Sequence, residues 1–284
     1  MGKLGAKLVA KISKVRHGKV IDFQAFAAGK AYAAGLQATV VGKGDLAGYD
    51  PSHALYVYAQ NQVSVFSEQI TSMPEMKAFY KLIAKAEDEY LPSGPPMSPL
   101  TASYFTSWAF FDACVGAETI GTITMEVGAA FGMHADLLKI IGIMQQSRMG
   151  IYIVEAGEPG AVVLKEPETG SVCRAIVPAG YVGRRGEIWY ARVLPPLLGT
   201  DHVVFTTPYV DEETPLQDWK AYFARTLPTQ RGDAYERLMK YGPTRRYWND
   251  YVFEAYVNHT PNAIFLAGLP DLPESRPHSR VNSQ

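Results

Sequence analysis

The stretch MGIYIVEAGEPGAVVLKEPETGSVCRAIVP, residues 149–178, decides the fold class of this chain of 284 residues. It contains three runs rich in β-branched and other apolar residues, separated by the turn signals GEPG and PETG. Short runs of this kind, bounded by Gly and Pro, are typical of strands joined by tight turns. The turns leave no room for crossover helices, so the pattern predicts antiparallel strands.

Two more runs follow the same rule, EIWYARVLP at 187–195 and HVVFTTPYV at 202–210. Together with the first three they predict a five-strand antiparallel β unit at about residues 149–210, which is either a small barrel or a strongly bent sheet. We expect this unit to contain essentially all the regular β structure of the chain.

Helical patterns flank the β unit on both sides. MPEMKAFYKLIAKAEDEYLP (73–92) carries an apolar stripe at helical spacing, and residues 100–147 form a weakly charged helical region interrupted by glycines. TPLQDWKAYFARTL (214–227) begins with a cap residue and a proline that favour a helix start. The predicted fold is α+β, with a mainly helical body. We expect a helical domain at 1–148, the β unit at 149–210, and C-terminal helices with an extended tail at 211–284 packed on the first part.

The N-terminal segment is basic. Leu4, Leu8, Ile12 and Val15 recur at helical spacing among lysines, which predicts a basic amphipathic helix in the helical domain. We favour a helix that packs on the body of the protein, and a phosphate-binding or membrane-binding arm is the alternative.

Composition limits the classes of protein that this chain can belong to. Hydrophobic residues make up 47% and charged residues 19%, as in ordinary soluble globular proteins. The net charge of −1 means that contact with nucleic acid would need a local basic patch. Cys114 and Cys173 are too few for a disulfide framework or a four-cysteine zinc site, and we expect reduced thiols. No secretory signal or transmembrane segment is visible, which favours a cytoplasmic protein.

The order of the parts is similar to that of a known module. A helical segment with FTSWAFFDA (105–113) and ETI (118–120) precedes SRMGIYIVE (147–155), VVLKEPETGS (162–171) and GRRGEIWYARVLPP (183–196). This arrangement resembles a module of uncharacterised bacterial proteins, some of which also carry a SEC-C zinc motif. The resemblance covers about residues 104–205 and implies a helical segment followed by a small β unit. The cysteine cluster of the SEC-C motif is absent here, so the resemblance implies neither a zinc site nor catalytic residues.

The β unit offers a candidate binding surface. Arginines and aromatic residues alternate in it, as they do in small barrels that stack bases and hold phosphates. The candidate binding residues are Tyr181, Arg184, Arg185, Trp189, Tyr190 and Arg192. Strand alternation places Trp189 and Ala191 on one face and Tyr190 and Arg192 on the other, so these residues cannot all share one site.

A second candidate lies in YGPTRRYWNDYVFEAYVNH, residues 241–259. We expect a helix from about Thr244 to Asn258 with Trp248 in the core. Its polar residues Asp250 and Glu254, together with His259, could serve a hydrolase-like enzyme, with or without a divalent metal. The spacing matches no metal-binding motif, and the histidines of the chain are too scattered for a local metal site.

The leading prediction is a non-catalytic binding or adaptor module that uses the basic and aromatic residues of the β unit. Its expected partner is a protein or a nucleic acid, and no cofactor is predicted. The alternative is the enzyme with Asp250, Glu254 and His259. An enzyme requires a concave pocket where catalytic side chains converge, whereas the binding module requires an exposed basic and aromatic surface.

Overall fold

The computed structural model describes residues 2–16, 43–90, 99–211, 216–227, 233–241 and 265–266, and the fold is α+β. The chain forms two compact units. We call Met1–Phe79 with Cys114–Gln145 the helical unit, and Tyr80–Ala113 with Gln146–Gln284 the barrel unit. This division differs from the three consecutive segments that the sequence predicts, because residues 80–113 belong with the strands.

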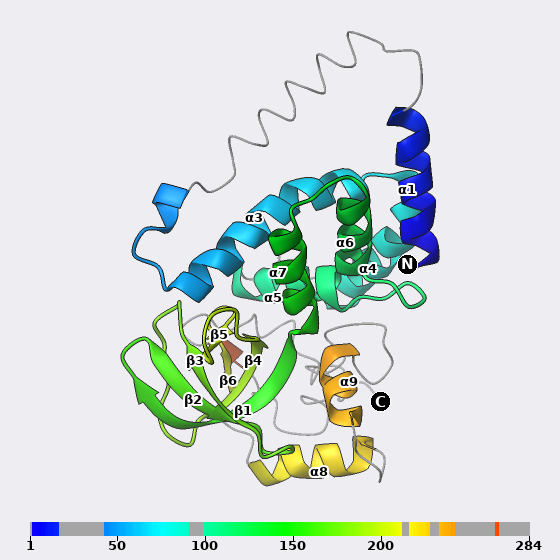
Figure 1. Ribbon diagram of the computed structural model, residues 1–284. Helices are drawn as coiled ribbons and strands as arrows, with labels where there is room; N and C mark the ends of the chain where they lie inside the picture. Colours follow the sequence, from blue (N-terminus) through cyan, green and yellow to red (C-terminus); the bar gives the residue numbers. More distant parts are fainter. Residues whose placement is uncertain are drawn as a thin grey trace. The chain divides into compact units, whose positions relative to one another are not determined.

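The barrel unit is built on a closed five-strand barrel (Figure 1). Its strands are β1 (Arg148–Glu158), β2 (Ala161–Lys165), β3 (Val172–Ile176), β4 (Ile188–Leu194) and β5 (His202–Val204). The hydrogen-bonded order is β1-β2-β3-β5-β4, and β1 also pairs with β4, which closes the barrel. The predicted β unit is therefore confirmed in position and in kind.

Two details of the sheet correct the prediction. The pair β3–β5 is parallel, with Ala175 opposite His202, so the barrel is mixed and not purely antiparallel. The fifth predicted run divides into β5 and β6 (Tyr209–Asp211), and β6 pairs with both β4 and the short β7 (Phe265–Leu266). The five barrel strands therefore form four antiparallel pairs and one parallel pair.

Strand alternation fills the inside of the barrel. Trp189, Ala191 and Val193 of β4 lie in one buried cluster with Tyr152 and with residues of β2, β3 and β5. Trp189 is completely buried, and its indole Nε1 donates a hydrogen bond to Glu187 at 3.1 Å. Tyr181 stacks on the same indole and also donates to Glu187, so these aromatic residues stabilise the end of the barrel.

Helices cover the outer face of β1 and β4. These helices are α4 (Lys77–Tyr90), α5 (Pro99–Phe111), α8 (Leu216–Thr226) and α9 (Ala234–Tyr241). Ile151 of β1 and Tyr190 of β4 share a second buried cluster with Trp108 of α5, Phe223 of α8 and Tyr235 of α9. Every residue of β4 is buried, because the interior of the barrel covers one face and the helices cover the other. The C-terminal helices thus pack on the barrel.

The helical unit contains α1 (Lys3–Arg16), η1 (Lys43–Leu46), α3 (Pro51–Thr71), η2 (Pro74–Met76), α6 (Ile120–Ala130) and α7 (Ala135–Gln146), of which Gln146 is assigned to the barrel unit. The predicted basic helix is α1, and Leu8 is completely buried. The carboxylate of Glu118 accepts hydrogen bonds from the backbone N–H groups of Leu4 and Gly5 at 2.9–3.1 Å. Negative charge at the start of a helix is favourable, so this contact fixes α1 within its unit. No described helix is long and apolar enough to cross a membrane.

Gly183→Ala should destabilise the barrel unit more than Gly186→Ala does. Both glycines have φ in the left-handed region, at 68° and 89°, which costs a residue with Cβ about 1–2 kcal/mol. A Cβ at position 183 would also lie 2.6 Å from the ring of Trp189, whereas nothing lies within 4 Å at position 186. We expect Gly183→Ala to cost about 1–3 kcal/mol more, the usual range for overpacking.

The three tryptophans that the structure describes, Trp108, Trp189 and Trp219, belong to the barrel unit, so their fluorescence during urea unfolding reports on this unit. Equal losses of stability in the two variants would show that the close approach of Trp189 does not constrain position 183.

Candidate functional site

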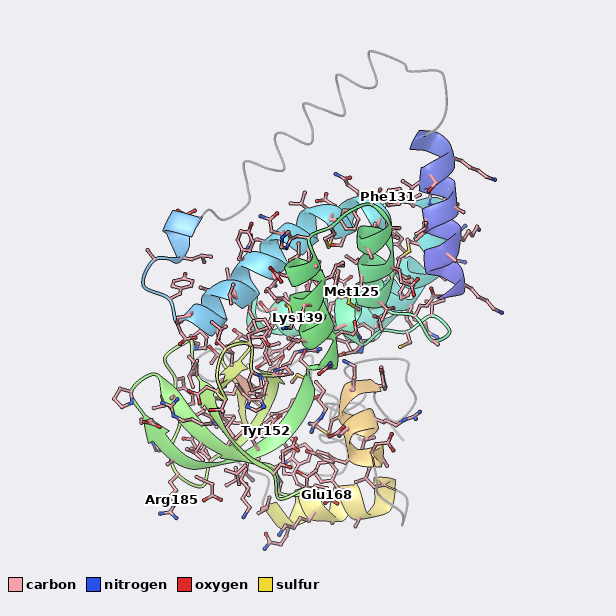
Figure 2. The ribbon with its side chains drawn as sticks, in the orientation of Figure 1. Met125, Phe131, Lys139, Tyr152, Glu168 and Arg185 are labelled. Carbon is pink, nitrogen blue, oxygen red and sulfur yellow. The ribbon has the colours of Figure 1, made fainter. Side chains whose placement is uncertain are left out.

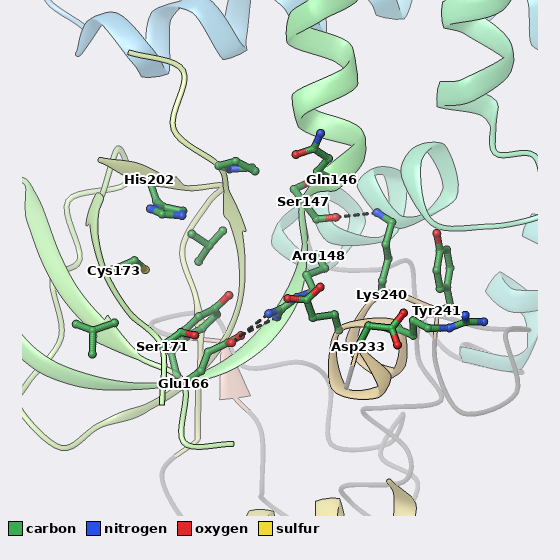
Figure 3. A pocket seen from close by; sticks show the side chains of 16 residues that line it. Gln146, Ser147, Arg148, Glu166, Ser171, Cys173, His202, Asp233, Lys240 and Tyr241 are labelled. Carbon is green, nitrogen blue, oxygen red and sulfur yellow. Dashed lines mark hydrogen bonds and ion pairs between the residues drawn. The ribbon is translucent and has the colours of Figure 1, made fainter. Parts of the chain in front are cut away.

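A cavity of about 650 Å³ opens in the barrel unit between the barrel and α9 (Figure 3). Its volume lies within the range of small-molecule binding sites. Strands β1, β3, β4 and β5, the β2–β3 turn and α9 contribute to its wall. The polar and charged side chains of this wall are Gln146, Ser147, Arg148, Tyr152, Glu166, Ser171, Cys173, His202, Asp233, Glu236, Arg237, Lys240 and Tyr241.

An ion pair between Arg148 and Glu166 is part of the wall. The guanidinium donates to both carboxylate oxygens, at 2.7 and 3.0 Å, and the two side chains are only 17% and 6% exposed. Thr169 donates a further hydrogen bond to Glu166, and the Arg148 guanidinium lies 5.2 Å from the ring centre of Tyr235. A bidentate pair with these additional contacts fixes the orientation of both side chains.

A second charged cluster lies directly behind the cavity. Arg192 donates to both oxygens of Asp112, at 2.6 and 3.2 Å, and also to the hydroxyl and the carbonyl of Ser147. Lys240 of α9 donates to Asp112 at 2.7 Å and to the Ser147 carbonyl at 2.8 Å. Asp112 and Arg192 are each 1% exposed, while Lys240 reaches the cavity wall. The cluster therefore joins α5, β1, β4 and α9 at the back of the site.

Helical periodicity explains how α9 serves both the core and the cavity. Tyr235, Leu238 and Met239 are buried against the barrel. Asp233, which directly precedes α9, and Glu236, Arg237 and Lys240 recur at helical spacing and line the cavity. The site therefore meets two carboxylates followed by two cations along this segment.

The thiol and the imidazole of the wall are both kept uncharged. Burial, with a smaller effect of Glu166, raises the pKa of the Cys173 thiol to about 11, so it is protonated at neutral pH. A protonated thiol is a poor nucleophile. Burial lowers the pKa of His202, and the nearby Asp201 carboxylate opposes this only in part.

The structure separates the predicted binding residues. Trp189, Tyr190 and Arg192 are buried, so they are not part of an exposed basic and aromatic face. The alternation itself is as expected, since Trp189 faces the barrel interior and Tyr190 faces the helices. Arg192 is buried because Asp112 lies opposite it, a partner that strand alternation does not reveal.

The other predicted binding and catalytic residues differ in exposure and in whether the structure describes them. Arg184 and Arg185 are exposed in the β3–β4 connection, and Figure 2 shows Arg185 directed away from the barrel. Tyr181 is half-buried next to them. The catalytic candidates Asp250, Glu254 and His259, and the predicted helix around Trp248, lie outside the residues that the structure describes.

Local sequence patterns do not reveal the residues that form the cavity. Arg148 and Glu166 are 18 residues apart, and Lys240 is 128 residues from Asp112. No local spacing marks either contact. The sequence pattern that points to the cavity is the charged side of α9, where acidic and basic residues recur at helical spacing beside an apolar stripe.

The helical unit has a cavity of its own, of about 870 Å³. Side chains of α3 and α7 line it, together with Tyr49, which stacks on His53. Its lining is mainly apolar, and its polar residues His134 and Asp136 are largely exposed. It therefore lacks the buried charged groups that distinguish the cavity of the barrel unit.

Comparison with known proteins gives no family for this chain. No protein-family model, no curated protein and no solved structure matches it. The resemblance to proteins with a SEC-C motif therefore stays a prediction.

Asp112→Asn should strongly destabilise the barrel unit. The substitution removes the negative charge that faces the buried Arg192 and the partly buried Lys240, and breaking a buried ion pair in this way costs about 3–5 kcal/mol. The matched control is Asp201→Asn, because Asp201 pairs with the exposed Arg174 and solvent-exposed ion pairs contribute little to stability. Urea unfolding followed by tryptophan fluorescence measures both variants. Similar stabilities of the two variants would contradict the central role of Asp112.

The barrel unit should lose stability as the pH falls below about 6.5, the ordinary pKa of histidine. The pKa of His202 is lowered in the folded state, so the unfolded chain binds a proton more readily in the range between the lowered pKa and 6.5. His202→Asn should reduce this slope of the unfolding free energy against pH. His134→Asn, at an exposed position of the helical unit, should leave it unchanged. An unaltered slope in His202→Asn would contradict the prediction.

Proposed function

We propose that this chain is a non-catalytic binding protein whose ligand is a small polar molecule held in the cavity of the barrel unit. The main support is the Arg148–Glu166 pair, which is fixed in the cavity wall by two mutual hydrogen bonds and by Thr169. Charged groups that are already oriented lose little freedom on binding, so preorganisation of this kind favours affinity.

The state of the Cys173 thiol supports binding over nucleophilic catalysis. Burial keeps this thiol protonated at neutral pH, and a protonated thiol is a poor nucleophile. The alternative enzyme would use Asp250, Glu254 and His259, which the described residues do not include.

A nucleic-acid partner has less support. OB-fold barrels bind oligonucleotides along the second and third strands and the adjacent loops. On this barrel Arg174 of β3 is held between the carboxylates of Glu158 and Asp201, so its charge is neutralised on that face. The exposed Arg184 and Arg185 are the remaining basic pair, and their contact with a protein or a nucleic acid stays a prediction.

Thermal unfolding in the presence of a panel of small polar compounds tests the proposal. A compound that binds only the folded state raises the free energy of unfolding by about 2.7 kcal/mol at a hundredfold excess over its Kd. We expect at least one compound to raise the unfolding temperature reported by tryptophan fluorescence. Ser171→Tyr places a bulky ring at the exposed rim of the cavity and should abolish this shift.

Thr200→Tyr is the matched control, because Thr200 is also exposed in a loop of the barrel but does not line the cavity. It should keep the shift. A compound that stabilises Ser171→Tyr as much as the parent would place the binding site elsewhere. A panel with no stabilising compound would contradict the proposal.

A further inference from the structure

The charges of the cavity wall specify a ligand class, if the proposed binding function is correct. The wall contains the cations Arg148, Arg237 and Lys240 and the carboxylates of Glu166, Asp233 and Glu236. Equal numbers of the two signs give no net attraction for a polyanion such as a nucleoside triphosphate, or for a polyamine. The wall instead offers positively and negatively charged side chains around the same cavity.

The charged row of α9 is open to a ligand. Asp233, Glu236 and Arg237 are exposed and line the cavity. Within the described part of the chain, none of these three side chains makes an ion pair or a side-chain hydrogen bond. Both an ammonium group and an acid group of a ligand can therefore find an oppositely charged partner on this helix.

The opposite wall supplies oriented donors. Arg148 donates to Glu166 and to the backbone carbonyl of Met149. A guanidinium has five N–H donors, so Arg148 keeps donors for an anionic group after these contacts are made. Figure 3 shows Arg148 between Glu166 and α9, which places this cation and the row on α9 around the same space.

We infer that the cavity binds a small zwitterion, with its acid group at Arg148 and Arg237 and its ammonium group at Asp233 and Glu236. A zwitterion pairs with both the cations and the carboxylates of the wall. A ligand with one charge would cover the wall groups of the same sign without pairing them, and this desolvation costs free energy. The ligand class is thus an amino acid or a related compound with one acid and one amino group.

A matched series of probes tests this inference. We would measure the stabilisation of the parent protein by straight-chain ω-amino acids of increasing length, and by the fatty acid and the alkylamine of each length. At least one ω-amino acid should bind, and its acid-only and amine-only counterparts should bind at least about tenfold more weakly. Equal binding by a singly charged counterpart would overturn the inference.

Variants that each remove one charge from the cavity wall test which residues bind the acid group and which bind the ammonium group of the ligand. Arg237→Gln should weaken the binding of the ω-amino acid but not that of the alkylamine, and Glu236→Gln should weaken the binding of the ω-amino acid but not that of the fatty acid. Lys220→Gln on α8 and Glu155→Gln on β1 are matched controls that remove one charge away from the cavity wall, and both should bind as the parent does. Loss of binding in the controls to the same extent would also overturn the inference.

Failure of the inference can be told apart from failure of the proposed function. If another polar compound stabilises the parent and not Ser171→Tyr, while no ω-amino acid binds, the cavity is a binding site but not one for zwitterions. If neither the ω-amino acids nor any compound of the panel binds, both proposals are wrong.

Discussion

The carboxylate of Asp112 is the contact on which the arrangement of the barrel unit depends. It receives hydrogen bonds from Arg192 of β4 and from Lys240 of α9, and both cations also donate to Ser147 at the start of β1. A carboxylate and a guanidinium that are each 1% exposed have lost almost all their hydration, so each depends on its partner. This mutual dependence fixes the end of α5 and one end of α9 against the barrel.

The position of α9 in turn creates the cavity. Tyr235 and Leu238 hold one side of the helix in the apolar core, and Lys240 holds its C-terminal end. Arg237 and its neighbours outside this core then line the cavity together with residues of β1 and the β2–β3 turn. The same packing that stabilises the fold therefore brings charged groups from distant parts of the chain around one site.

Burial of charge has a cost that apolar packing would avoid. Well-packed apolar residues in place of a buried ion pair often leave a protein equally or more stable. The two clusters of the barrel unit lie within and directly behind one cavity, and the pair of Arg148 and Glu166 belongs to its wall. A role in orienting groups for a ligand would explain why the charges lie there, which agrees with the proposed binding function.

The sequence alone determined the positions of the strands, of most helices and of the β unit as a whole. Alternation within EIWYARVLP correctly separated Trp189 from Tyr190, because the side-chain period of a strand is local. Only the tertiary structure decided that both faces of β4 are buried, that β3 and β5 pair in parallel, and that Arg192 is an internal residue. Its contact with Asp112 joins residues 80 positions apart. Local patterns encode neither such a contact nor the cavity beside it, because both arise when separate elements pack together.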